Sequence, residues 1–82
     1  MTNKNIFDSL TPIFREVLDS PSLVLTADLS ASDVANWDSL NHITLIVEIE
    51  ALTGLSLSTD ELVSLQNVGD FVRLLFDKGY RG

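Results

Sequence analysis

The sequence of 82 residues contains no cysteine, and this absence removes several classes of site. Without cysteine the chain forms no disulfide, and with one histidine it cannot assemble a zinc site from cysteine and histidine. No apolar run follows Lys4 near the N-terminus, and none elsewhere reaches the roughly 18 residues of a membrane span. We therefore expect a soluble cytoplasmic protein without a metal site, forming a single domain over residues 1–82 with its core at about 6–78.

Basic residues are missing from the middle of the chain. Twelve acidic and five basic residues give a net charge of −7, and no Lys or Arg lies between Glu16 and Val72. A field of this sign repels nucleic acid and anionic membranes, and it attracts basic protein surfaces. Solubility alone would explain the charge equally well. A hydrophobic content of 45% argues against intrinsic disorder.

Hydrophobic spacing predicts an all-α fold, a small four-helix bundle with three main helices, one short helix and a long loop after the first helix. The first helix is expected within residues 5–19: either it begins near Thr11 with Pro12 at its first position, or, as the apolar stripe favours, a longer helix kinks at Pro12. The loop covers residues 21–37. Within it, residues 23–26 resemble a strand that has no partner, so we predict a loop there, and residues 32–34 favour a short turn of helix.

Capping residues predict where the other helices begin and end. Asp38 is a good N-cap for a helix that runs to about Thr53, and Gly54 would end it in the left-handed conformation. The third and fourth helices have corresponding signals. These are Ser58 with Glu61 as a capping box, and Asn67 as N-cap with Gly79 as the stop.

The second helix carries two apolar stripes, whereas a surface helix needs only one. The stripe on the Ser39 side consists of Leu40, Ile43, Val47 and Ala51, and the nearly opposite stripe of Leu45, Ile49 and Leu52. Two interpretations are open: the helix packs on both sides, or the stripe on the Ser39 side stays partly exposed for a partner.

Ser39 lies on the first turn of this helix, within the sequence Trp37-Asp38-Ser39-Leu40. Its hydroxyl should be exposed there, and the free amides and positive dipole end suit an attached or bound phosphate. The plain alternative is that Asp38 and Ser39 only cap the helix. His42 is a poor base for a nucleophilic Ser39, because no third group orients it and no glycine-rich oxyanion turn is present. We expect no enzyme, and a His42 that is polar and at the surface.

These features resemble the acyl carrier protein family. The resemblance covers about residues 6–78 and rests on Asp38-Ser39-Leu40 at a helix start, the order of the helices, and the final Val68-Gly69-Asp70-Phe71-Val72. It implies a specialised discrete carrier of bacterial type. Ser39 would bear a covalent 4′-phosphopantetheine derived from coenzyme A, whose thiol holds acyl groups as thioesters. Asp38 would be the acid beside the modified serine.

The motif departs from the common form of that family. Ala35 and Asn36 replace a Leu-Gly pair, and Asn36 is expected to take the left-handed conformation that glycine would supply. Asn41 and Thr44 stand where acids are usual, and of a later acidic pair only Glu50 remains. Fewer charges predict weaker binding to housekeeping synthase enzymes, and hence a carrier of a specialised pathway.

The resemblance also implies partners. These are a phosphopantetheinyl transferase and acyl-transferring, acyl-activating or condensing enzymes of fatty acid, polyketide or other lipid biosynthesis, with basic docking surfaces. We expect a monomer that binds neither nucleic acid nor membrane. Expected recognition residues are Trp37, Leu40, Asn41, Ile43, Thr44, Val47 and Glu50, and candidates for an acyl cleft are Ile46, Ile49, Leu62 and Val68. A peptidyl or aminoacyl carrier and an acidic interaction module without cofactor are the open alternatives.

Overall fold

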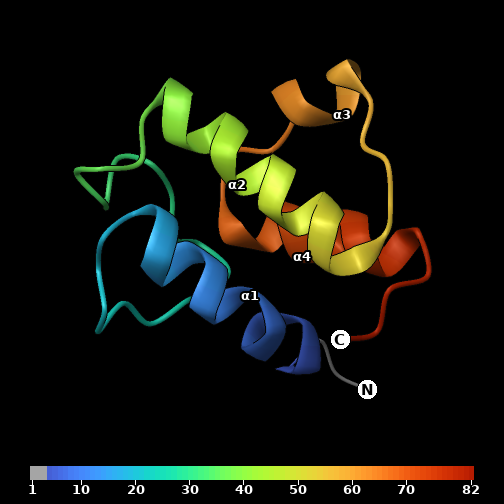
Figure 1. Ribbon diagram of the computed structural model, residues 1–82, viewed down its shortest axis with the longest axis horizontal. Helices are drawn as coiled ribbons and strands as arrows, with labels where there is room; N and C mark the ends of the chain where they lie inside the picture. The colour runs from blue at the N-terminus through green and yellow to red at the C-terminus, as the bar shows by residue number, and fades with distance from the viewer. Residues whose placement is uncertain (1–3) are drawn as a thin grey trace.

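The computed structural model describes residues 4–82, and within them it contains four helices and no named strand. The helices are α1 (Lys4–Val17), α2 (Ser39–Thr53), α3 (Thr59–Val63) and α4 (Val68–Asp77). Figure 1 shows α2 crossing in front of α4, with α1 beneath both and α3 on the far side from α1. This arrangement confirms the predicted all-α bundle with one short helix and a long first loop. Residues 1–3 of the expected domain lie outside the described residues.

Helix α1 places one apolar stripe against the core. Ile6, Leu10 and Phe14 are each no more than 1% exposed. Pro12 lies inside the helix, as predicted, and on its exposed side. The missing amide of a proline is tolerated there because the carbonyl it leaves unpaired is open to water. The helix ends at Val17.

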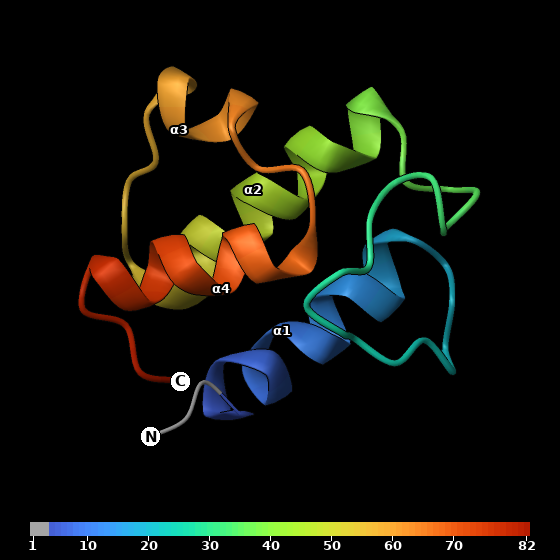
Figure 2. The same cartoon turned by 180° about the vertical axis from the view of Figure 1, so that it is seen from behind.

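Three aromatic rings join the parts of the core. The ring of Phe14 meets the rings of Trp37 and Phe71 edge to face, with centroids 5.5 Å apart in both pairs. Edge-to-face pairs at this separation add to the free energy of burial. Through them α1, the segment that leads into α2 and the first turn of α4 share one core. Figure 2 shows these helices from the α4 side.

The long first loop is tied by its backbone to the start of α4. The amide of Val68 donates to the carbonyl of Leu29 over 2.9 Å, and the amide of Gly69 donates to the carbonyl of Ala27 over 2.8 Å. A Cβ at position 69 would lie 2.9 Å from that carbonyl oxygen of Ala27. The loop therefore approaches α4 so closely that position 69 accommodates only glycine without displacement.

Two local expectations in this loop are wrong and one is confirmed. Residues 32–34 form no helical turn; a hydrogen-bonded turn closes instead from the Asp33 amide to the Ser30 carbonyl over 2.9 Å. Asn36 is not left-handed, because Asp19 is the one non-glycine residue between 4 and 82 with a positive φ. The side-chain amide of Asn36 donates to the Leu18 carbonyl over 2.8 Å, which fixes its backbone another way. Residues 23–26 form no strand, as expected.

The predicted caps are confirmed. The Asp38 carboxylate accepts from the amide of Asn41, and Gly54 ends α2 with φ of 74°. The bonds of the other two helices follow the same chemistry. Ser58 and Glu61 form the complete capping box of α3, Asn67 accepts from the Asp70 amide, and α4 ends at Asp77, just before Lys78 and Gly79.

Within residues 4–82, no helix is both long and apolar enough to cross a membrane.

Candidate functional site

Ser39 is the first residue of α2 and its side chain is exposed. Asp38 precedes it as the N-cap, with one carboxylate oxygen accepting the Asn41 amide over 2.9 Å. The Ser39 hydroxyl has no hydrogen-bond partner among residues 4–82, so capping does not occupy it. A free primary alcohol thus stands at the positive end of a helix of 15 residues, a position that suits a phosphoryl group.

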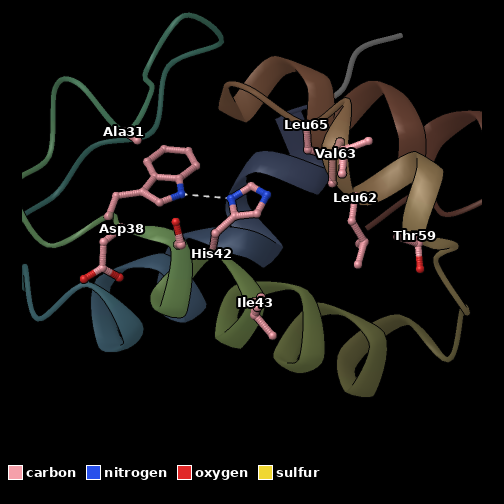
Figure 3. Close-up of a pocket in the computed structure, with 10 residues that line it drawn as sticks. Ala31, Asp38, His42, Ile43, Thr59, Leu62, Val63 and Leu65 are labelled. Atoms are coloured by element: carbon pink, nitrogen blue, oxygen red, sulfur yellow. Dashed lines mark hydrogen bonds between the residues drawn. The ribbon is translucent and has the colours of Figure 1, made fainter.

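A groove of about 630 Å³ opens beside Ser39, between the first turns of α2 and helix α3. Figure 3 shows the side chains that line it. Its apolar lining comprises Ala31, Trp37, Ile43, Leu62, Val63 and Leu65, and its polar lining Asp38, Ser39, His42 and Thr59. A flexible chain attached at Ser39 would therefore have a largely apolar surface next to its point of attachment.

Trp37 is more deeply buried than expected, and its ring holds that of His42. Trp37 is 4% exposed and packs in the core, so it offers a partner little surface, and it is among the residues that line the groove. Its indole N–H donates to Nδ1 of His42 over 3.1 Å, and the two rings stack with 17° between their planes. His42 is half-buried and lines the groove, so it lies partly at the surface, with its ring held against Trp37.

The apolar residues of α2 are divided between core and surface. Leu45 and Ile49 are fully buried, and Ile46 is 3% exposed. Leu52 was expected to join them but is 46% exposed. The buried face is centred between Leu45 and Ile46, and at 100° per residue Leu52 falls roughly 70° from that centre.

The opposite stripe is exposed, which decides between the two interpretations of this helix. Leu40 is 73%, Ile43 57% and Val47 55% exposed. The helix does not pack on both sides within residues 4–82. Three large apolar side chains in a row along one helix face, next to Ser39, form a surface of the kind that protein partners bind. We refer to Leu40, Ile43 and Val47 as the apolar face.

The polar candidates on α2 bond within the chain. The side-chain amide of Asn41 donates to the Asn36 carbonyl over 2.7 Å. The hydroxyl of Thr44 donates to a carbonyl of its own helix. The carboxylate of Glu50 accepts from the Leu57 amide over 2.8 Å and so holds the segment that leads to α3. Asn41 thus holds the segment before α2 and Glu50 the segment before α3, whereas Thr44 bonds only within its own helix.

Helix α3 supplies the second wall of the groove, and sequence reasoning found only part of it. Leu62, a predicted cleft residue, lines the groove, whereas Ile46, Ile49 and Val68 lie in the core instead. Val63 was missed, although it is 74% exposed. Its signal was an apolar residue beside Leu62 in a helix too short to bury both.

One ion pair fastens α3 to α4. The Lys78 ammonium lies 3.0 Å from the Glu61 carboxylate. The Ser58 backbone N–H, which donates to Glu61, and then Lys78 hold the pKa of Glu61 below its usual value of 4.5.

Among residues 4–82 no three His, Cys, Asp or Glu side chains gather as a metal site would require.

Comparisons with known proteins identify the family to which this chain belongs. A family model described as "Phosphopantetheine attachment site" matches residues 8–75. Among solved structures, the chain is similar to a holo acyl carrier protein from Geobacter metallireducens, with 47% identity over 88% of this chain and 83% of that one, and a TM-score of 0.82. No curated protein matches. A family model over most of the chain and a close structural likeness together show that the chain belongs to the acyl carrier protein family, as a covalent carrier of 4′-phosphopantetheine and not an enzyme.

Proposed function

We propose that Ser39 is the residue to which 4′-phosphopantetheine is attached. The observation that carries this proposal is the free, exposed Ser39 hydroxyl at the start of α2, opening onto an apolar groove. When bound, the group supplies a thiol that holds acyl intermediates as thioesters. The residues around Ser39 fit it, because a phosphodiester suits the amide end of a helix and the apolar walls suit a flexible arm.

Asp38 serves the modification of Ser39 in this proposal. Its side chain is exposed, and only one of its two oxygens bonds to the chain, at the Asn41 amide. The other oxygen faces no partner among residues 4–82 and is available to a phosphopantetheinyl transferase. The cap therefore fixes the position of the carboxylate beside Ser39 while leaving half of its bonding capacity free.

The apolar face is the surface that we propose the partner enzymes bind. Leu40 follows Ser39 directly, and Ile43 also lines the groove, so this face and the attachment point are contiguous. A net charge of −7 would steer partners with basic docking surfaces toward it. An interface built on the apolar face is expected to be small and short-lived, which suits a carrier that visits several enzymes.

We further propose that the protein is a cytoplasmic monomer serving a specialised fatty acid, polyketide or other lipid pathway. Support comes from Asn41 and Thr44, which bond to their own chain where acids would offer charge to a partner. A transfer assay with generic fatty acid synthase enzymes tests this. Turnover equal to that of a housekeeping carrier would contradict the specialised role.

Intact-mass spectrometry tests the attachment site. The protein is incubated with coenzyme A and a promiscuous phosphopantetheinyl transferase, and a gain of one phosphopantetheine is expected. Ser39→Ala should abolish the gain. Ser56→Ala is the matched control, because Ser56 is also exposed and free of hydrogen bonds, and it should be modified normally. If the wild-type protein gains no mass, an acidic interaction module is favoured instead.

A further inference from the structure

The hydrogen bond between Trp37 and His42 fixes which imidazole nitrogen carries the proton. An indole nitrogen donates and never accepts, so Nδ1 of His42 must be the acceptor in the 3.1 Å bond. In the neutral ring the proton then lies on Nε2. The ring is also held by its stacking on Trp37 and by an edge-on contact with Phe71 at 5.6 Å. His42 is therefore a fixed N–H donor at Nε2.

That donor faces the groove. Figure 3 shows Nδ1 of His42 directed at Trp37 and the other ring nitrogen directed toward the side where Leu62 and Val63 lie. Nε2 has no hydrogen-bond partner among residues 4–82. On that side Ile43, Leu62 and Val63 have no side-chain acceptor to offer, and the polar lining of the groove is Asp38, Ser39 and Thr59. An N–H group in such a wall selects a ligand that brings its own oxygen acceptor.

His42 is also within reach of a group on Ser39. The two residues are three apart on α2, which places them on the same helix face with Cβ atoms about 5–6 Å apart. The half of a phosphopantetheine arm next to its phosphate carries a hydroxyl and an amide carbonyl. Both oxygens accept hydrogen bonds, and both precede the second amide and the thiol along the arm.

We propose that His42 is a positioning residue that donates a hydrogen bond from Nε2 to an oxygen of this phosphate-proximal half of the arm, with Trp37 setting the required tautomer. This inference rests on Ser39 being the attachment residue. The arm then lies against Ile43 and Leu62 between deliveries, and its thiol end stays free to move. Trp37 acts through the hydrogen bond that it donates to His42.

Nuclear magnetic resonance of the whole protein tests the proposal without any activity assay. Protein labelled with ¹⁵N histidine is compared before and after attachment of phosphopantetheine. Attachment should shift the Nε2 proton of His42 downfield and slow its exchange with water, while Nδ1 keeps the signal of an unprotonated acceptor. Nuclear Overhauser contacts should join the His42 ring to the methyl groups of the arm.

Variants separate the two roles. His42→Phe keeps an aromatic ring but lacks the donor, so the contacts between the arm methyl groups and position 42 should be lost. Trp37→Phe should leave the Nε2 and Nδ1 tautomers mixed in the ¹⁵N spectrum. Thr59→Val removes the other neutral donor of the groove wall and serves as control, with the contacts retained.

The outcomes are distinguishable. Attachment at Ser39 by mass, together with identical Nε2 signals and no ring-to-arm contacts, overturns the role of His42 and leaves the carrier function standing. Absence of any mass gain at Ser39 overturns the proposed function and this inference with it. The comparison of the wild-type protein without and with phosphopantetheine does not depend on how well any variant folds.

Discussion

Lys78, just beyond the end of α4, and Glu61, in α3, form an ion pair of 3.0 Å, the one described link of this kind between these two helices. The same Glu61 carboxylate accepts the Ser58 amide over 2.8 Å. Glu61 therefore connects the cap of its own helix to the far end of the next one, and its charge matters to both.

The pKa of Glu61 gives a pH prediction. The Ser58 amide and then Lys78 lower it in the folded protein relative to the usual 4.5. A lowered folded pKa contributes stability that is full above the unfolded pKa and is lost as the pH falls through the folded pKa. Glu61→Gln should flatten the decline in the free energy of unfolding below about pH 4.5, measured by urea denaturation. Asp60→Asn, an exposed neighbour, should keep the decline. An unchanged slope in Glu61→Gln would contradict the prediction.

The pair of Trp37 and His42 predicts a coupling energy. His42→Phe leaves the buried indole N–H without its acceptor, which should lower the free energy of unfolding by about 1–3 kcal/mol. The double variant with Trp37→Phe should lose less than the two single losses together, by about 0.5 kcal/mol or more. Urea denaturation of all four proteins measures this cycle. Strictly additive losses would show that the hydrogen bond contributes nothing.

Replacing Gly69 by alanine should change the stability of the fold in the direction opposite to that usual for a glycine in a helix. In a helix, Gly→Ala normally stabilises by about 1 kcal/mol. Here the new Cβ would lie 2.9 Å from the Ala27 carbonyl oxygen, a backbone atom. We expect Gly69→Ala to destabilise by about 1–3 kcal/mol, because the loop must move away from α4. Thermal unfolding measures the change, with Arg73→Ala on the exposed side of α4 as a control. A higher midpoint for Gly69→Ala would refute the close approach.

Truncation to alanine should lower the free energy of unfolding much more at Leu45 than at Leu40. Leu45 is fully buried, so Leu45→Ala should cost about 2–5 kcal/mol of folding free energy. Leu40 is 73% exposed, so Leu40→Ala should change stability by less than about 0.5 kcal/mol.

The same Leu40→Ala protein should lose function despite its stable fold. Because Leu40 belongs to the apolar face, we expect a lower kcat/KM of the phosphopantetheinyl transferase toward it. Val24→Ala removes apolar surface from a side chain that is 69% exposed in the first loop, and it should be modified at the normal rate. Equal losses in both variants would argue against a specific face.

The helix boundaries were predictable from sequence because capping is local. Asp38, Ser58 and Asn67 each bond an amide three residues along the chain, so residue type and spacing decide the outcome. The division of α2 into a buried and an exposed stripe was also visible as a pattern. Which stripe was buried needed the positions of α1 and α4, and Leu52 shows how far a pattern on one helix can mislead.

The features that sequence reasoning missed depend on residues far apart. Trp37 is buried because Phe14 and Phe71 meet it from α1 and α4, and no local spacing reveals that encounter. Asn36 reaches back to the Leu18 carbonyl, so it needs no left-handed backbone. Glu50 accepts the Leu57 amide across the turn at Gly54, and its carboxylate alone gave no sign of this.

The two walls of the groove are anchored unequally. Helix α2 contributes Leu45, Ile46 and Ile49 to the core, whereas none of the five residues of α3 is buried. The contacts that hold α3 are the partly buried Leu62, which packs against the core, and the pair of Lys78 and Glu61. The width of the groove is therefore set mainly by the position of α3, since the α2 wall is held by its three core side chains.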